Sequence, residues 1–204
     1  MKVKVKICGI TNLEDALAAV DYGADALGFV FYKGSPRYIS AEAAKEIIKQ
    51  LPPLITTVGV FVDETPERIE DTLRHVPIDI AQLHGHEPPE SCLLSRRVIK
   101  AIRVKELSDL EPLKKYRVSA FLLDTYTPES LGGTGQIFNW DIAVAAKQFG
   151  HIILAGGLNP ENIERAIRWV RPYAVDVSSG IEEEKGKKDL KKMRLFIERA
   201  KALY

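Results

Sequence analysis

The chain has 204 residues, 46% of them hydrophobic and 28% charged, which is typical of a globular protein and excludes a disordered one. Lys and Arg number 29 against 28 for Asp and Glu, so the net charge of +1 gives no indication of a nucleic-acid partner. No apolar run approaches the ~20 residues of a membrane span, and the first residues do not form a leader. We therefore expect one domain over residues 1–204, in the cytoplasm, without membrane or nucleic-acid partners.

Eight short apolar segments have the length and composition of strands. Several are apolar throughout, as expected for a parallel sheet covered by helices. In chain order they are residues 3–7, 26–31, 57–62, 78–83, 98–102, 120–123, 152–154 and 174–177.

Segments of helical period separate these strands. The apolar positions predicted to face the sheet are Leu13, Ala16, Leu17 and Val20; Ile163, Ala166, Ile167 and Val170; and Leu190, Met193, Ile197 and Ala200 in the last helix. Helix N-caps are expected at Ser40, Thr65 and Asn159, with Pro66 and Pro160 in the first helical position. The charged run at 182–192 is interpreted as a solvated surface.

Eight strand–helix units in 204 residues leave about 25 residues each, close to the lower size limit of the (β/α)8 barrel. The alternative is a doubly wound open sheet, which usually has fewer strands. No Gly-x-Gly-x-x-Gly follows the first strand, where the sequence is Cys8-Gly9-Ile10. The pattern therefore favours an α/β protein with a single (β/α)8 barrel domain.

In such a barrel the active site lies at the carboxyl ends of the strands. The residues found there include Cys8, the loop 33–37, Asp63, His84, Arg103, Asp124 and Asp176. The loops after the seventh and eighth strands contain Gly156-Gly157 and Ser178-Ser179-Gly180. Their joint position suggests a phosphate site, although small residues also make tight turns.

Each candidate has a structural alternative. Cys8 is a possible reagent or a buried small side chain, and Asp124 is a possible acid or a loop cap. His84 could orient a ligand or bond within the rim, and Arg37 could hold a carboxylate or lie in solvent. Cys92 falls in a predicted helix and is assigned no chemistry. A flap is suggested at Gly132 to Gly135, and no Cys/His cluster has zinc-ligand spacing.

Segments along nearly the whole chain resemble the phosphoribosylanthranilate isomerase family of tryptophan biosynthesis. They are Lys6-Ile7-Cys8-Gly9-Ile10-Thr11, Gly28-Phe29-Val30-Phe31, Ser35-Pro36-Arg37-Tyr38-Ile39, Val58-Gly59-Val60-Phe61-Val62, Gln82-Leu83-His84-Gly85, Leu123-Asp124-Thr125, Leu154-Ala155-Gly156-Gly157-Leu158 and Val175-Asp176-Val177-Ser178-Ser179-Gly180-Ile181.

The resemblance implies an Amadori rearrangement of N-(5-phosphoribosyl)anthranilate to the carboxyphenylamino-deoxyribulose phosphate, with no metal or organic cofactor. It makes Cys8 the general base at sugar C2 and Asp124 the general acid at the ring oxygen. It makes Arg37 the holder of the anthranilate carboxylate. The phosphate would lie on Gly156, Gly157, Ser178, Ser179 and Gly180, while His84 and Asp176 match substrate-site positions. The family contains monomers and homodimers, and a loop residue such as Leu131 could face a partner or a ligand.

The chemistry needs a protonated acid and a deprotonated base. Free thiols and carboxyls, with pKa values of ~8.5 and ~3.9, favour the reverse at neutral pH. We therefore expect the site to keep Asp124 protonated, by desolvation or a neighbouring carboxylate such as Asp176. We expect positive charge or N–H groups to lower the pKa of Cys8.

Two other functions stay open. A histidine-pathway phosphosugar isomerase would be expected to use paired aspartates and duplicate phosphate loops. A phosphometabolite-binding module without turnover would keep the phosphate loops alone.

Overall fold

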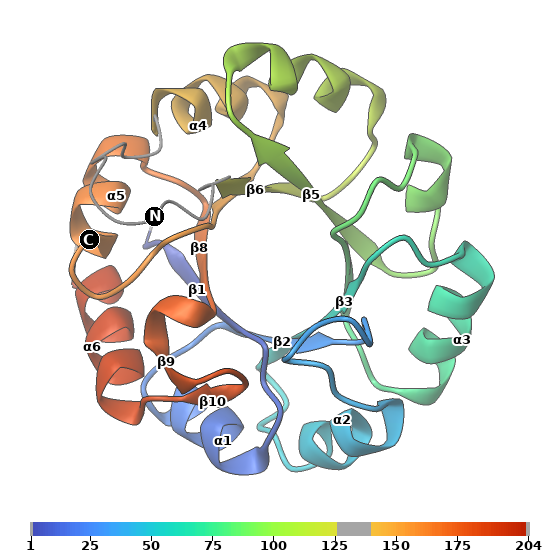
Figure 1. Ribbon diagram of the computed structural model, residues 1–204, viewed down its shortest axis with the longest axis vertical. Helices are drawn as coiled ribbons and strands as arrows, with labels where there is room; N and C mark the ends of the chain where they lie inside the picture. Colours follow the sequence, from blue (N-terminus) through green and yellow to red (C-terminus); the bar gives the residue numbers. More distant parts are fainter. Residues whose placement is uncertain (1, 126–139, 203–204) are drawn as a thin grey trace.

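The computed structural model describes residues 2–125 and 140–202, and it contains a closed barrel of eight parallel strands. The (β/α)8 prediction is therefore confirmed, with each strand paired to the next and β8 paired to β1 (Figure 1). The strands are β1 (Lys4–Cys8), β2 (Ala26–Val30), β3 (Thr56–Phe61), β4 (Ile80–Leu83), β5 (Arg97–Val104), β6 (Ala120–Thr125), β7 (Ile152–Leu154) and β8 (Ala174–Val177).

Helices form a ring outside these strands (Figure 1). The α-helices are α1 (Leu13–Asp21), α2 (Ala41–Ile48), α3 (Pro66–His75), α4 (Trp140–Ala146), α5 (Ile163–Val170) and α6 (Leu190–Lys201). Short 3₁₀ helices are η1 (Pro89–Cys92), η2 (Leu107–Lys115), η3 (Lys147–Phe149) and η4 (Ser179–Ile181). No helix in the described ranges has the length and apolar character needed to cross a membrane.

Two connections depart from the expected α-helices. They are η1, a segment of only four residues, and η2, where Pro112 lies inside the helix and an α-helix would lose a hydrogen bond. Cys92 therefore ends a 3₁₀ helix and lies buried there.

The predicted caps at Ser40 and Thr65 are confirmed, since each side chain accepts a backbone N–H of the first turn. The third prediction is wrong. Helix α5 begins at Ile163, because the Asn159 side chain accepts the N–H groups of Glu161 and Asn162 and holds residues 160–162 in a turn. Pro160 consequently lies before the helix.

The buried faces of α5 and α6 match the predicted positions, apart from the half-buried Leu190. Helix α1 differs, because Leu17 is exposed whereas Asp15, Ala16 and Ala19 are buried. The carboxylate of Asp15 accepts the backbone N–H of Lys188, so a polar contact sets the rotation of this helix.

The pleat of the strands separates two layers of the core. Outward residues such as Ile7, Phe29 and Leu123 join the large apolar cluster beneath the helices. Inward residues such as Ile99, Leu122 and Ile153 form a smaller cluster within the barrel. Toward the carboxyl ends of β1, β4, β6 and β8, the inward positions carry polar and reactive side chains. They are Lys6 and Cys8, Gln82, Asp124 and Asp176, with His84 just beyond β4.

Candidate active site

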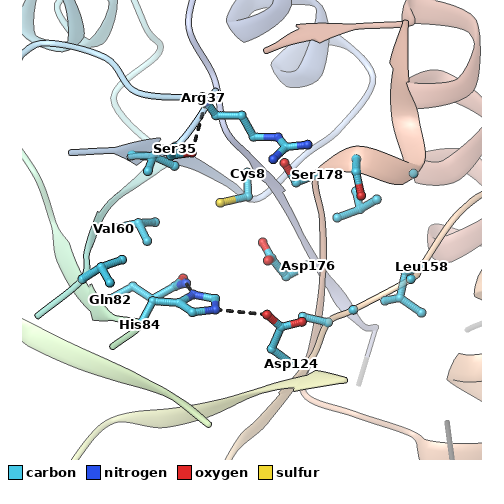
Figure 2. Close-up of a pocket in the computed structure, with 18 of the residues that line it drawn as sticks. Cys8, Ser35, Arg37, Val60, Gln82, His84, Asp124, Leu158, Asp176 and Ser178 are labelled. Carbon is cyan, nitrogen blue, oxygen red and sulfur yellow. Dashed lines mark hydrogen bonds and ion pairs between the residues drawn. The ribbon is translucent and has the colours of Figure 1, made fainter. Parts of the chain in front are cut away.

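Every site residue predicted from the sequence lines one pocket at the carboxyl ends of the strands. The pocket encloses about 410 Å³, within the usual range for small-molecule sites (Figure 2). The predicted residues it brings together are Cys8, Arg37, His84, Asp124, Gly156, Gly157, Asp176, Ser178, Ser179 and Gly180.

Cys8 lies beside a buried ion pair. Lys6, two positions earlier on β1, places its Nζ 2.8 Å from Oδ1 of Asp176 on β8, and their side chains are only 4% and 10% exposed. Gly28 on β2 leaves room for this group, since a Cβ there would lie 2.8 Å from the Cys8 Sγ and 3.0 Å from the Lys6 Nζ. We call Lys6, Cys8 and Asp176 the base side of the pocket.

The protonation of Cys8 differs from the expectation. Burial, the largest influence, raises the pKa of the Cys8 thiol; Lys6 opposes that rise, and Asp176 adds to it. The prediction of a lowered pKa is therefore wrong for this structure, because burial, with the added effect of Asp176, outweighs the lowering by the positive charges of Lys6 and Lys188. Lys6 itself stays charged: burial opposes this, but the Asp176 and Cys8 charges raise its pKa above the usual value.

Asp124 lies in different surroundings, on the side of the pocket formed by β4 and β6. Its Oδ2 is 3.1 Å from His84 Nε2, and the other ring nitrogen of His84, Nδ1, is 2.9 Å from Gln82 Nε2 (Figure 2). The side chains of His84 and Asp124 are 22% and 33% exposed, so this part of the pocket reaches solvent. We call Gln82, His84 and Asp124 the acid side.

Arg37 is held by the carboxylate of Glu182, a residue of the charged run for which the sequence predicts a solvated surface. Its Nε and Nη2 donate to Glu182 at 2.7 and 2.6 Å, and Lys188 Nζ lies 2.9 Å from the same carboxylate. Lys188 is fully buried and also donates to the carbonyl of Cys8 at 2.7 Å. Its own pKa is lowered by burial, which the charge of Glu182 opposes.

The interpretation of 182–192 as a solvated surface is therefore wrong at Glu182 and Lys188. These residues belong to the hairpin of β9 (Glu182–Glu184) and β10 (Lys187–Lys188), which the chain forms between β8 and α6. In the two strands of this hairpin, the solvated residues are Glu183, Glu184 and Lys187.

The two predicted phosphate loops meet at the pocket. Gly156 and Gly157 have φ of 75° and 64°, values in the left-handed region that favours glycine. Gly180 is required for a different reason, because a Cβ there would collide with the backbone oxygen of Leu158. Among the described residues, the N–H groups of Gly156 and Gly157 have no hydrogen-bond acceptor. They can therefore serve an anion.

Other strand-end residues have varied positions. Arg103 is exposed and lines the pocket next to Asp124, with which it is in register. Asp63 lies elsewhere, where its carboxylate accepts the backbone N–H of His86. The suggested flap at Gly132 to Gly135 and Leu131 fall outside the described residues. Over those described, no cluster of three or more His, Cys, Asp or Glu side chains is suited to a metal ion.

Together, the fold and pocket define a class: a (β/α)8 barrel with a thiol, a carboxyl and two loops of glycine and serine around one small-molecule cavity. The model of the N-(5'-phosphoribosyl)anthranilate (PRA) isomerase family matches residues 5–199. The chain belongs to this family. It is 58% identical to the N-(5'-phosphoribosyl)anthranilate isomerase of Geobacter sulfurreducens, over 98% of each chain.

Solved structures agree with the sequence relatives. Phosphoribosyl anthranilate isomerase from Thermotoga maritima is 50% identical, with a TM-score of 0.91 over 98% of this chain and all of that one. A second structure, at 47% identity and a TM-score of 0.88 with the same coverage, is a complex with reduced 1-(o-carboxyphenylamino)-1-deoxyribulose 5-phosphate.

Proposed function

We propose that this chain isomerises N-(5-phosphoribosyl)anthranilate to 1-(2-carboxyphenylamino)-1-deoxy-D-ribulose 5-phosphate, an Amadori step of tryptophan biosynthesis. Family membership gives the reaction. The observation that supports the residue roles is that Cys8, Asp124 and the phosphate loops line the same pocket from β1, β6, β7 and β8.

In the proposed first step, Asp124 protonates the furanose ring oxygen as the C1–O bond breaks. The anilino nitrogen supplies the electron pair, and an open-chain iminium forms. The Cys8 thiolate then removes the C2 proton, the electron pair of the C–H bond forms the C1–C2 double bond, and the pair of the C=N bond returns to nitrogen. The resulting enolamine gives its enol proton to the Asp124 carboxylate and takes a proton at C1 from the Cys8 thiol, which yields the ketose and restores both groups. Both groups must be held within reach of one sugar, and we assign that task to the phosphate loops and Arg37.

Arg37 is proposed to bind the anthranilate carboxylate. Its pairing with Glu182 uses Nε and Nη2, which leaves Nη1 for a substrate oxygen. Lys188 shares the negative charge of Glu182, so the pair retains net positive charge toward the pocket. We assign Asp176 the role of keeping Lys6 in place beside Cys8.

These assignments imply reverse protonation. The active form has a protonated acid and an ionised base, whereas the dominant form has an ionised acid and a protonated base. A carboxyl ordinarily titrates well below a thiol, and burial raises the pKa of Cys8 further. The lower limb of a kcat/KM pH profile would then belong to Asp124 and its partners, and the upper limb to Cys8. In such a pair, the fraction of the enzyme in the active protonation state falls about tenfold for each pH unit between the pKa of the acid and the pKa of the base.

The finer properties are also proposals. We propose that the 204 residues act as one cytoplasmic domain on a small phosphosugar, as a monomer or homodimer and without nucleic acid. One solved structure is described as generated monomers of the dimeric phosphoribosylantranilate isomerase from Thermotoga maritima.

The test is the loss of anthranilate-type fluorescence when the unstable substrate is generated in situ with the purified chain. We expect conversion to the carboxyphenylamino-deoxyribulose phosphate, which has the same mass as the substrate and is identified by NMR from the CH2 group at C1 and the ketone at C2. If the folded chain leaves this substrate unchanged but converts the histidine-pathway phosphosugar, the assignment fails. Binding of either compound without conversion would favour the binding module.

A further inference from the structure

A buried glutamine adjoins the acid side of the pocket. Gln82 is 1% exposed, and its amide contacts His84 Nδ1 while His84 Nε2 contacts Asp124 (Figure 2). Its other amide atom, Oε1, is buried without a hydrogen-bond partner among the described residues. A buried unpaired oxygen normally destabilises the folded state, so this arrangement needs a reason.

The hydrogen-bonding rules of the three groups allow two arrangements. When Asp124 is ionised it only accepts, so His84 carries its proton on Nε2, and Nδ1 accepts from Gln82 Nε2. When a second proton lies in the contact between Asp124 and His84 Nε2, or on the His84 ring itself, Nδ1 becomes a donor, and Gln82 must turn its amide to present Oε1. One amide atom is unpaired in either orientation, so the surroundings of Gln82 favour neither one.

We propose that Gln82 and His84 form a reversible hydrogen-bond relay that fits both protonation states of Asp124, which makes Gln82 a positioning residue for the isomerisation. Asp124 then keeps a hydrogen-bond partner before and after it gives its proton to the ring oxygen. The proposal rests on the proposed function, because Asp124 must cycle between these two states only if it is the acid.

Hydrogen bonds of the fold hold the His84 backbone in place while the Gln82 amide turns. The backbone N–H of His84 donates to the carbonyl of Phe61 on β3 at 2.8 Å. On either side of it, the carbonyls of Leu83 and Gly85 accept from the buried Nζ of Lys100 at 3.4 and 2.7 Å. Rotation of a terminal amide is therefore sufficient for the relay to change state.

Charged groups face this relay from several elements. Arg103 on β5 is in register with Asp124, and Lys6, Cys8 and Asp176 line the base side. Lys100 is paired with Glu87 at 2.6 Å, so its charge is offset locally. None of these groups contacts Gln82 Oε1, which leaves the state of the amide to His84.

The test compares two substitutions of Gln82 with a matched control. In Gln82→Glu the carboxylate accepts only, so it favours the doubly protonated pair. We expect the lower midpoint of the kcat/KM pH profile to move up by about one pH unit, with the upper midpoint unchanged. In Gln82→Met the amide is lost at similar volume, and we expect kcat to fall about tenfold with little change in KM. Gln148→Glu adds the same charge change at an exposed site.

A second readout needs no substrate. Nitrogen NMR of labelled histidine reports which ring nitrogen of His84 carries a proton. We expect Nε2 alone above the lower midpoint, and a proton on Nδ1 below it. Thermal unfolding verifies that the variants fold.

Three outcomes would overturn the relay: an unmoved lower midpoint in Gln82→Glu, an equal movement in Gln148→Glu, or an Nδ1 that stays unprotonated through the transition. Failure of the parent chain to convert the substrate would instead overturn the proposed function, and the NMR result would still decide on the relay.

Discussion

The base and acid sides of the pocket differ in the surroundings that control the protonation of Cys8 and of Asp124. Cys8 lies in a dry environment between β1, β2 and β8, with the Lys6–Asp176 ion pair beside it. Asp124 lies partly open to solvent and contacts His84, which in turn contacts the amide of Gln82. Burial and fixed charge shift a titration strongly, whereas a relay keeps an acid hydrogen-bonded in both states. The contrast suggests a base set by electrostatics and an acid set by hydrogen bonding.

The largest loss of activity is expected when the Cys8 thiol on the base side is removed. We expect Cys8→Ala to lower kcat by about 10³-fold, because general-base catalysis contributes on this scale and no other thiol lines the pocket among the described residues. A product analogue should still bind with an unchanged Kd, measured by calorimetry. Cys92→Ala is the matched control and should keep parental kcat. Equal turnover in Cys8→Ala and the parent would remove Cys8 from the mechanism.

The next largest loss of activity is expected when Asp124 on the acid side can no longer supply a proton. In Asp124→Asn the amide can bond to His84 but cannot transfer a proton to the ring oxygen, so we expect kcat to fall by about 10²- to 10³-fold. The measurement is single-turnover loss of substrate fluorescence. The assignment would be contradicted if this variant kept more than about a tenth of parental kcat.

Replacing Lys6 sharpens the contrast, because it removes the positive charge that opposes burial at Cys8. In Lys6→Met the pKa of Cys8 should rise, so the upper limb of kcat/KM should move to higher pH. With reverse protonation, the plateau value of kcat/KM should fall about tenfold for each unit by which the pKa of Cys8 rises. Stability should fall by about 3–5 kcal/mol in urea unfolding, because Asp176 is left buried and unpaired.

The double variant Lys6→Met/Asp176→Asn is the control for that stability loss. It should recover part of the free energy of unfolding, since the unpaired charge is gone. A movement of the lower limb instead of the upper one would contradict the assignment of the two limbs.

The smallest effect is expected at Glu182, which holds Arg37 beside the base side. In Glu182→Gln the guanidinium loses its charged partner, and we expect KM to rise by up to about tenfold with a smaller change in kcat. Glu183→Gln on the same hairpin, where the side chain is 62% exposed, carries the same charge change and should be near parental. Equal KM values in the two variants would separate Glu182 from substrate binding.

The sequence predicted the barrel because strand length and helical period are local signals. It predicted which residues lie together, because residues that follow parallel strands meet at one end of the barrel. Cys8, Asp124 and Gly156 were found in this way, and they line the same pocket.

The residues that were missed lie inside the strands or beyond them. Lys6 and Gln82 lie two positions before Cys8 and His84 and share their inward face, so the alternation of side chains was an available signal. Glu182 and Lys188 carried no such signal. Their burial depends on the β9–β10 hairpin folding back onto Arg37 and the carbonyl of Cys8, contacts that are remote in sequence.

The most direct test is the kcat/KM pH profile of the parent chain, with single-turnover data to establish that chemistry limits the rate. We expect two limbs, a lower one from the Asp124 relay and an upper one from Cys8, with the upper limb moving to higher pH in Lys6→Met. A profile that is flat from about pH 5 to 9 would contradict a thiol base working with a carboxyl acid.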